Sequence, residues 1–380
     1  MNAGPLGGLT VIELAGLAPA PFAATMLADL GADVVRVDRA SPGADVLGIP
    51  NDPLTRSRRT IGVDTKTPDG VEVVLSLAER ADVLIEGFRP GVAERMGLGP
   101  EQVHARNPRL VYGRITGWGQ DGPLAPVAGH DINYIGLSGA LSTIGRAGDK
   151  PVAPVNYLGD FGGGGLYLAM GVLAALYERM SSGVGQVVDA SMVDGSALLT
   201  TQLYGMKAAG AWSGERGANL LDGGAPFYDT YACADGRYVA VGAIEMRFWA
   251  ALVEVLELDA ESLPLHLDQS QWPKLREILA EAIGKYSRDE LVAKAAGTDA
   301  CLTPVLTPEE AADHPHNVAR GTFAEVGGMV QPAPGPKFGR TPAPEPQAPH
   351  PAGADTAEVL GEFGYDGDAI AALREAGAVA

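Results

Sequence analysis

The chain has 380 residues and a net charge of −19, from 28 basic and 47 acidic residues, which argues against a nucleic-acid-binding protein. Hydrophobic residues make up 46% and charged residues 20%, so a substantial core can form and global disorder is disfavoured. The cysteines Cys233 and Cys301 cannot by themselves form a metal cluster or a disulfide framework, so we expect no metal and a reducing cytoplasm.

The first half of the chain alternates strand and helix patterns. Its N-terminus, MNAGPLGGLTVIEL, lacks the basic region of a secretory signal, so we expect none. Strands are predicted over residues 10–14, 33–37, 82–86, 110–115 and 186–189, and helices among them over 22–30, 70–79 and 90–96. Because strand–helix–strand units favour parallel pairing with right-handed crossovers, we expect an α/β domain with a large, doubly wound parallel sheet of the Rossmann-like type.

A long apolar helix is predicted over residues 160–180, and a further helix over 190–209. We expect Asp160 to cap the N-terminus of the long helix. Gly162–Gly165 are poor helix formers, so their position at a helix start predicts the close approach of a ligand or of another backbone. Because glycines or charges interrupt every long apolar run, we expect no membrane span.

The pattern changes from Tyr228 onward. Residues 228–245 predict an antiparallel hairpin that turns at Ala234-Asp235-Gly236, and helices follow over 246–256, 272–285 and 288–296. This region, about 225–325, therefore reads as a second, smaller α+β domain. Residues 331–352 contain eight prolines and predict an extended arm rather than a packed element.

The parallel sheet invites a test for a dinucleotide site. Gly16 follows the first strand, but no GxGxxG motif occurs there. Asp38 ends the second strand, where an acid that binds a ribose would stand. This is half of the fingerprint, and without the glycines we disfavour nicotinamide binding.

Basic residues are concentrated in one segment of the acidic chain. Residues 36–114 hold 12 basic and 11 acidic residues, which leaves 16 basic and 36 acidic residues for the rest. Guanidinium groups suit phosphate, and ligands of open α/β sheets gather where strands end. Seven basic residues lie at or just after predicted strand ends: Arg39, Arg56, Arg58, Arg59, Lys66, Arg89 and Arg95. A solvated surface is the alternative for each residue, but for the set we favour a phosphate or nucleotide site.

Two short motifs place a base and an acid about thirty residues apart, His130 in GHDINY and Asp160 in GDFGGGG. A base opposite an acid is what proton transfer at a carbon atom requires. Each residue also has a simpler interpretation, His130 as an exposed loop residue and Asp160 as a plain helix cap. Asp131 could fix the imidazole ring or cap the helix that follows it over 132–137. Together with the glycines, the two motifs favour a proton-transfer site.

Longer motifs give the chain a family resemblance. TGWGQDGP and DFGGG are common to the family III CoA-transferase superfamily, and GHDINY marks its α-methylacyl-CoA racemase branch. The chain resembles this branch nearly end to end. The resemblance implies interlocked homodimers with the active site between two chains. It also implies a large CoA-binding α/β domain from residues 1–190 with 330–380, a connecting segment over 191–224 and a small domain over 225–325.

The resemblance further implies roles for individual residues. His130 and Asp160 would exchange the proton, and Glu245 would orient His130 from the partner chain. Asn156, Asp131 and Tyr228 would belong to the site. The implied contacts with coenzyme A are Arg39, Val63, Thr65, Lys66, Gly87, Phe88, Arg89, Arg95, Gly129, His130 and Tyr134; none is assigned to Arg56, Arg58 or Arg59.

The implied reaction interconverts (2R)- and (2S)-2-methylacyl-CoA thioesters by 1,1-proton transfer through an enolate. It needs no cofactor, because coenzyme A is part of the acyl-CoA substrate, and it involves neither nucleic acid nor membrane. We expect the helix N-terminus at Gly162–Gly165 to donate to the enolate oxygen. For the proton on Asp160, the helix dipole and an apolar acyl pocket act in opposite directions.

Two other functions compete with proton transfer. In a CoA transferase, Asp160 would be a nucleophile that forms an anhydride and then an aspartyl thioester. In a CoA-binding module without catalysis, neither His130 nor Asp160 would be required. His130 favours the racemase, since a transferase has no evident use for a base there. The sequence does not identify the acyl group.

Overall fold

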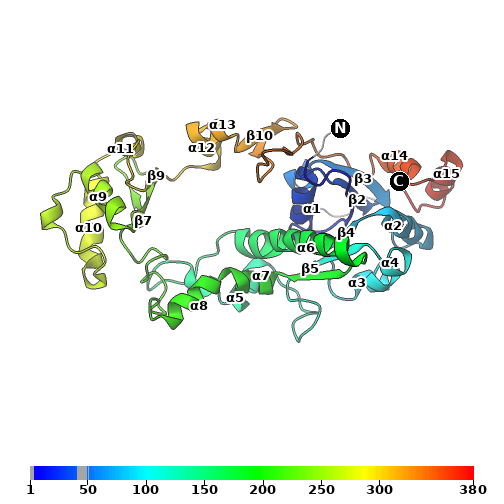
Figure 1. Cartoon of the computed structure of the whole chain (residues 1–380), viewed down its shortest axis with the longest axis horizontal. Helices are drawn as coiled ribbons and strands as arrows, with labels where there is room; N and C mark the ends of the chain where they lie inside the picture. The colour runs from blue at the N-terminus through cyan, green and yellow to red at the C-terminus, as the bar shows by residue number, and fades with distance from the viewer. Residues whose placement is uncertain (1–3, 41–48, 50) are drawn as a thin grey trace. The chain divides into compact units, whose positions relative to one another are not determined.

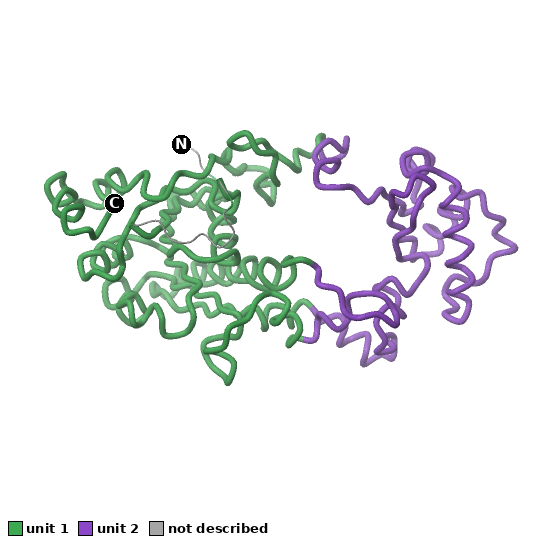
Figure 2. The backbone as a smooth tube through the Cα atoms, turned by 180° about the vertical axis from the view of Figure 1, so that it is seen from behind, with its two compact units in different colours: residues 1–138, 155–199, 318–380 green, residues 139–154, 200–317 purple. Residues whose placement is uncertain are grey.

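The structure is a computed structural model that describes residues 4–40, 49 and 51–380 (Figure 1). Residues 1–3, 41–48 and 50 of the predicted large domain lie outside the described residues. The chain divides into two compact units, each described separately below (Figure 2). The first comprises residues 1–138, 155–199 and 318–380, and the second comprises 139–154 and 200–317. The second unit thus includes residues 139–154, which the sequence analysis assigned to the large domain.

The first unit contains a six-stranded sheet in the order β3-β2-β1-β4-β5-β6. Every neighbouring pair is parallel, so the predicted doubly wound α/β sheet is confirmed. The strand order reverses between β1 and β4, and in such sheets ligands bind outside the carboxyl ends of the strands near that reversal. The strands are β1 (Thr10–Leu14), β2 (Asp33–Arg39), β3 (Arg58–Val63), β4 (Val83–Glu86), β5 (Val111–Thr116) and β6 (Val187–Ser191).

Alternate strand residues enter two separate cores, because successive side chains of a strand point to opposite faces. Ile12, Val35 and Leu84 face one core, while Val11, Val34 and Val83 face the other. The first core is covered by helices α2 (Pro68–Arg80), α4 (Pro100–Arg106), α14 (Thr356–Glu362) and α15 (Gly367–Glu375). The second core is covered by α1 (Pro19–Asp29) and α6 (Leu166–Ser182).

Strand β3 was not predicted, because its first residues are polar. Arg58 is nevertheless only 2% exposed, and its Nε lies 2.5 Å from Oε2 of the fully buried Glu13 on β1. Arg36 of β2, the register partner of Glu13, places Nη1 2.6 Å from Oε1 of the same carboxylate. Three charged side chains therefore compensate one another inside the sheet, although each would suggest an exposed position in the sequence.

The predicted helix over 160–180 begins earlier and in another form. Tyr157–Gly165 is π-helical, with Asn156 at its N-cap, and continues directly into α6. The prediction that Asp160 caps this helix is therefore wrong, because Asp160 lies in the first turn and Asn156 is the cap residue. The predicted helix over 190–209 is two helices, α7 (Met192–Leu199) and α8 (Thr201–Ala208).

The glycines of this segment allow other backbones to approach. A Cβ atom on Gly163 would lie 2.6 Å from the amide nitrogen of Ser196 in α7, and one on Gly165 would lie 2.6 Å from the carbonyl oxygen of Pro19 in α1. Of the two alternatives that the sequence left open for Gly162–Gly165, close packing by neighbouring backbones is the one observed for these two glycines.

One helical stretch among the described residues, Tyr157–Ser182, is long and apolar enough to cross a membrane by length and composition alone. The glycines and charges that interrupt the apolar runs of the sequence predict no such stretch. Of its apolar window, 44% is buried in the protein, and Leu168 and Val172 belong to the core beneath the sheet. A core helix passes the same test, so the stretch is weak evidence for a membrane span.

The second unit contains a three-stranded antiparallel sheet in the order β7-β8-β9. The predicted hairpin is present, with Tyr228 paired to Gly242 and Ala232 to Tyr238. The sheet packs with three helices around buried aromatic residues that include Phe227, Trp249 and Trp272. The elements are β7 (Tyr228–Ala232), β8 (Tyr238–Gly242), β9 (Leu302–Pro304), α9 (Met246–Val255), α10 (Trp272–Ile283), α11 (Arg288–Ala295) and α12 (Pro308–Asp313).

The segment that follows was not predicted in detail. Helix α13 (Pro315–Arg320) leads into a hairpin of β10 (Phe323–Val326) and β11 (Met329–Pro332). Val318 and the residues after it belong to the first unit, so the predicted end of the small domain at 325 falls inside β10. The buried Gln331 ties β11 to the rest of this unit, because its Oε1 accepts a 2.8 Å hydrogen bond from Arg56.

Candidate active site

His130 stands at the N-cap of α5 (Asp131–Leu137), with its side chain exposed. Its backbone N–H donates to Oδ1 of Asn133 at 3.0 Å, and its carbonyl accepts from the Asn133 N–H at 2.8 Å. These reciprocal bonds fix the backbone of the residue while the imidazole stays accessible. The histidine is thus presented on a rigid helix start, as a group that exchanges protons must be.

Tyr134 packs against the residues that precede α5 and hydrogen-bonds to Gly129. It is 7% exposed, its hydroxyl donates to the carbonyl of Gly129, and its ring meets Trp118 edge-on with 4.8 Å between centroids. Burial raises the pKa of the Tyr134 hydroxyl to about 12, so it stays protonated as a donor. The predicted contact of Tyr134 with the thioester stays a prediction; its observed partners are protein groups.

Asp160 lies in the first turn of the π-helical segment and is half-buried. The side-chain amide of Asn156 donates to its Oδ2 at 3.1 Å. Burial raises the pKa of the Asp160 carboxyl; Asn156 opposes this, the negative charge of Asp131 adds to it, and His130 opposes it. Since the net direction is upward, burial outweighs the groups that favour the anion, and the carboxyl is better suited to hold a proton than an ordinary aspartate.

Asp131 occupies neither of the positions that the sequence suggested. Its Oδ1 accepts from the backbone N–H groups of Gly159 at 2.6 Å and of Asp160 at 2.8 Å. The carboxylate therefore caps the neighbouring helical segment, rather than its own helix or the ring of His130. Asp131, the residue next to His130, therefore fixes the backbone of Asp160, the acid of the proposed pair.

The predicted donors for an enolate were placed wrongly. Gly162–Gly165 lie inside the π-helical segment, where backbone N–H groups bond to carbonyls five residues earlier. They are therefore not a helix N-terminus. Among the described residues, the N–H groups of Asp131 and Ile132 directly follow His130 at the start of α5, have no carbonyl partner within their helix and are the better candidates.

The seven basic residues of the predicted phosphate site separate into two groups. Arg56 and Arg58 lie at the amino end of β3, buried in ion pairs with Asp29 and Glu13. Arg59 is also at that end and pairs with Asp33 and Glu362. The prediction is wrong for these three, because they lie at the sheet edge opposite the ligand edge and their guanidinium groups are already paired.

The other group lies at or beyond the carboxyl ends of the strands. Its members, Arg39, Lys66, Arg89 and Arg95, are exposed, and within the described residues their side chains form no ion pair. The turn that follows β4 and carries Arg89 is held by Glu86, whose Oε2 accepts from the Phe88 N–H at 2.7 Å. An exposed cationic rim beside exposed Gly87 suits a phosphorylated ligand.

Two further residues of the implied CoA site lie at the end of β3. The side chain of Val63 is buried in the core, so only its backbone can meet a nucleotide. Thr65 is half-buried in the turn before α2.

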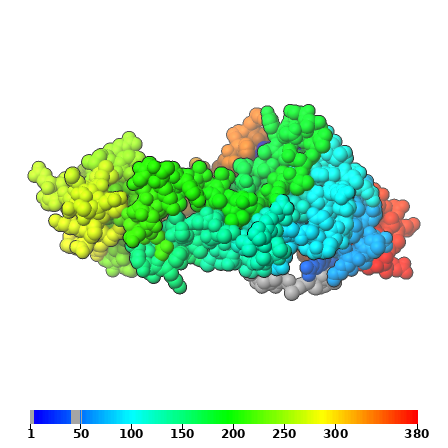
Figure 3. Space-filling view, turned by 90° about the horizontal axis from the view of Figure 1, so that it is seen from below, coloured from blue at the N-terminus to red at the C-terminus, as the bar shows by residue number. Residues whose placement is uncertain are grey.

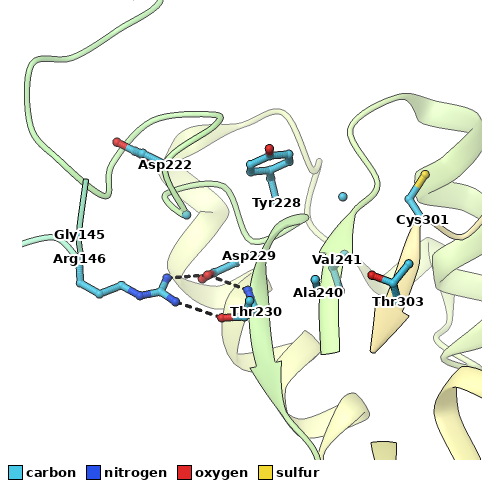
Figure 4. A pocket seen from close by; sticks show the side chains of 12 residues that line it. Gly145, Arg146, Asp222, Tyr228, Asp229, Thr230, Ala240, Val241, Cys301 and Thr303 are labelled. Carbon is cyan, nitrogen blue, oxygen red and sulfur yellow. Dashed lines mark hydrogen bonds and ion pairs between the residues drawn. The ribbon is translucent and has the colours of Figure 1, made fainter. Parts of the chain in front are cut away.

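Glu245 and Tyr228 belong to the second unit. Glu245 is the exposed N-cap of α9, and its implied role toward His130 stays a prediction. Tyr228 lines a pocket of about 610 Å³ on the open face of the small sheet, together with Cys301 and Arg146 (Figure 4). Arg146 is paired with Asp229 at 2.5 Å, and burial raises the pKa of the Cys301 thiol. The acid/base pair of the first unit is not part of this pocket lining.

Within the described residues, no cluster of three or more His, Cys, Asp or Glu side chains is arranged to hold a metal ion.

The chain matches known proteins along most of its length. The model of CoA-transferase family III matches residues 6–356. The chain belongs to CoA-transferase family III. Among relatives of this family, it is 47% identical to the alpha-methylacyl-CoA racemase of Mus musculus and 46% identical to that of Homo sapiens, over 97% of the chain and 96% of each relative. A CAIB/BAIF family protein from Brucella suis, of known crystal structure, covers 95% of the chain with a TM-score of 0.81 and 27% identity.

Proposed function

We propose that this family III protein is an α-methylacyl-CoA racemase that interconverts (2R)- and (2S)-2-methylacyl-CoA thioesters. The observation that carries the proposal is the pairing of an accessible imidazole with a carboxyl of raised pKa on two adjoining helix starts. The similarity to two racemases over nearly the whole chain supports it.

The proposed reaction passes through an enolate. The α-proton of a thioester is acidified because its carbonyl can accept the negative charge. In one direction, neutral His130 removes this proton from one face and protonated Asp160 delivers a proton to the other; the reverse direction exchanges the roles. The raised pKa of Asp160 supports its part as a donor. Coenzyme A enters as part of the substrate, and these side chains are all that the route uses.

The N–H groups at the start of α5 stabilise the enolate oxygen in this proposal. They directly follow His130, and the positive end of the helix dipole favours a developing anion. The cationic rim of Arg39, Lys66, Arg89 and Arg95 binds the phosphates of coenzyme A, and Gly87 allows the ligand close to the backbone.

The alternative is CoA transfer with Asp160 as a nucleophile. A carboxylate with a raised pKa is protonated more of the time, which disfavours nucleophilic attack. Incubation with 2-methylacyl-CoA in deuterated water separates the two. The racemase incorporates deuterium at the α-carbon; absence of deuterium, with CoA appearing on an added free acid, establishes the transferase instead.

A homodimer is part of the proposal and is supported by helix α6. Leu166, Met170, Tyr177 and Met180 are 47–82% exposed, and their spacing places them on one stripe of the helix. The green segment that includes α6 forms part of the surface in Figure 3. Exposed apolar stripes of this kind mark interaction sites, and a second copy of the chain is the occupant we propose.

The dimer is tested by light scattering on the wild type and on Met170→Glu/Tyr177→Glu. A wild-type dimer that the double variant converts to a monomer supports it. A wild-type monomer, or binding of the wild type to phosphatidylcholine vesicles through this helix, contradicts it. We place the protein in the cytoplasm, and the free thiols of Cys233 and Cys301 suit a reducing compartment.

A further inference from the structure

The carboxylate of Asp131 is buried between the two helix starts of the candidate site. The residue is 6% exposed, and its Oδ1 alone accepts both helix N–H groups, from Gly159 at 2.6 Å and Asp160 at 2.8 Å. Its Oδ2 is buried without a hydrogen-bond partner among the described residues. This geometry is unusual, since buried carboxylate oxygens normally have partners.

A plain helix cap does not require this arrangement. An amide oxygen could accept the same two N–H groups, because one carbonyl oxygen has two lone pairs. The carboxylate differs from an amide only by its negative charge and by the second oxygen. That oxygen bonds to no described group. The negative charge is therefore what distinguishes Asp131 from an amide at this position, although burying a charge is unfavourable.

The charge lies beside the acid of the proposed reaction. Oδ1 of Asp131 is bonded to the backbone nitrogen of Asp160, and a negative charge at that position opposes ionisation of the Asp160 carboxyl. The groups that act on Asp160 are Asn156, which donates to it, Asp131 and His130. Arg89 and Asp131 in turn act on the nearby Tyr134.

We infer that Asp131 is a positioning residue with two separable effects on the proposed racemase. As a cap, it holds the first turn that carries Asp160 against the start of α5. As a buried anion, it keeps a proton on Asp160. The inference rests on the proposed function for its kinetic consequence, but not for the geometry or for the proton affinity.

Two substitutions separate these effects. Asp131→Asn keeps the cap and removes the charge, whereas Asp131→Ala removes both. Asp366→Asn is the matched control, because Asp366 caps α15 in the ordinary way by accepting from Ala369 at 2.8 Å.

The first measurement is the pH profile of kcat/KM for α-proton exchange in deuterated water. Only the form of the His130–Asp160 pair that holds a single proton is productive, so the profile is bell-shaped and its limbs belong to the pair. In Asp131→Asn both limbs move to lower pH, on the order of one unit, because a neighbouring negative charge is lost. In Asp131→Ala the maximum itself falls at least tenfold. Asp366→Asn moves neither.

The second measurement does not depend on turnover. Protein labelled with carbon-13 at the aspartate carboxyls is titrated by NMR, and the Asp160 signal is assigned by its absence in Asp160→Asn. Its midpoint falls in Asp131→Asn and stays in Asp366→Asn. If the Asp160 midpoint and the limbs are unmoved in a folded Asp131→Asn protein, the inference is overturned and Asp131 is only a structural cap. If the wild type exchanges no α-proton, the proposed function fails, and the NMR midpoint alone still decides the inference.

Discussion

The side-chain amide of Asn156 donates to Oδ2 of Asp160 across 3.1 Å, four residues along the same segment. This bond favours the charged form of a carboxyl whose burial favours the neutral one. Without it, removal of the α-proton by Asp160 should become slower, because the carboxylate loses the hydrogen bond that orients it. In Asn156→Ala we expect the limbs of the kcat/KM profile to move to higher pH and the maximal exchange rate to fall about tenfold. An unmoved profile would show that the bond has no role in the chemistry.

Replacing either member of the acid/base pair should stop exchange and spare binding. His130→Ala and Asp160→Ala are each expected to lower the α-proton exchange rate by about 10²–10⁴-fold, the usual contribution of a general acid or base. Titration calorimetry with coenzyme A should give nearly the wild-type Kd, because neither side chain belongs to the cationic rim. His350→Ala is the control, since His350 pairs with Asp355 far along the sequence. Full activity in both variants would refute the assignment.

The raised pKa of Asp160 predicts a pH-dependent stability difference. A carboxyl whose pKa is higher in the folded than in the unfolded state stabilises the fold below its unfolded pKa, and this contribution is lost as the pH rises through the folded pKa. Asp160→Asn removes the titrating group. Its Tm relative to the wild type should therefore be more favourable at pH 7 than at pH 4. The check is differential scanning calorimetry at both values; an equal difference at the two pH values would contradict the shift.

Two arginines from the same basic segment should respond in opposite ways. Arg95 is exposed on the ligand rim, so Arg95→Ala should raise the Kd for coenzyme A about tenfold and leave Tm unchanged. Arg58 is buried against Glu13, so Arg58→Ala should cost about 3–5 kcal/mol of folding free energy, because the buried carboxylate loses one of its two guanidinium partners and keeps only Arg36. Calorimetric Tm and coenzyme A titration measure both. Loss of affinity with unchanged Tm in Arg58→Ala would reverse the assignment of the two sheet edges.

The close helix contact at Gly163 predicts sensitivity to a single methyl group. Gly163→Ala would press against the backbone of Ser196, and we expect a loss of about 1–3 kcal/mol in denaturant unfolding. Gly205 in α8 provides the matched control, because a Cβ atom there meets nothing within 4 Å. Gly205→Ala should be neutral or stabilising by about 0.5–1 kcal/mol. Equal effects of the two substitutions would show that helix propensity, and not packing, explains Gly163.

The sheet could be predicted from the sequence where apolar runs mark buried strands, as at Thr10–Leu14 and Val83–Glu86. Strand β3 escaped because Arg58-Arg59-Thr60 resembles a surface segment, and only the tertiary pairing with Glu13 makes Arg58 a core residue. For the same reason the basic residues could not be sorted. Their positions along the sequence do not reveal which end of a strand they occupy.

At the candidate site, the sequence motifs single out His130 and Asp160 as candidates, but they do not reveal the hydrogen bonds that support these two residues. The bond of Asp131 to Gly159 and Asp160 joins residues 28 and 29 positions apart and leaves no periodic pattern. The π-helical start at Tyr157 was equally hidden, because the glycines after it suggest the end of a loop rather than the inside of a helix. From the sequence, glycines that pack against Ser196 and Pro19 cannot be distinguished from glycines that leave room for a ligand.

The six residues Gly129–Tyr134 also limit how this loop can change. The Tyr134 hydroxyl donates to the carbonyl of Gly129, and Oδ1 of Asn133 accepts from the His130 N–H. Oδ1 of Asp131 accepts from the N–H of Asp160 in the neighbouring segment. Each bond has its own direction around the helix start, so the residues work only at fixed angular positions. A one-residue insertion or deletion would rotate the later side chains by about 100° relative to the earlier ones and break these bonds together. The hexapeptide should therefore tolerate conservative exchanges of side chains but no change in length.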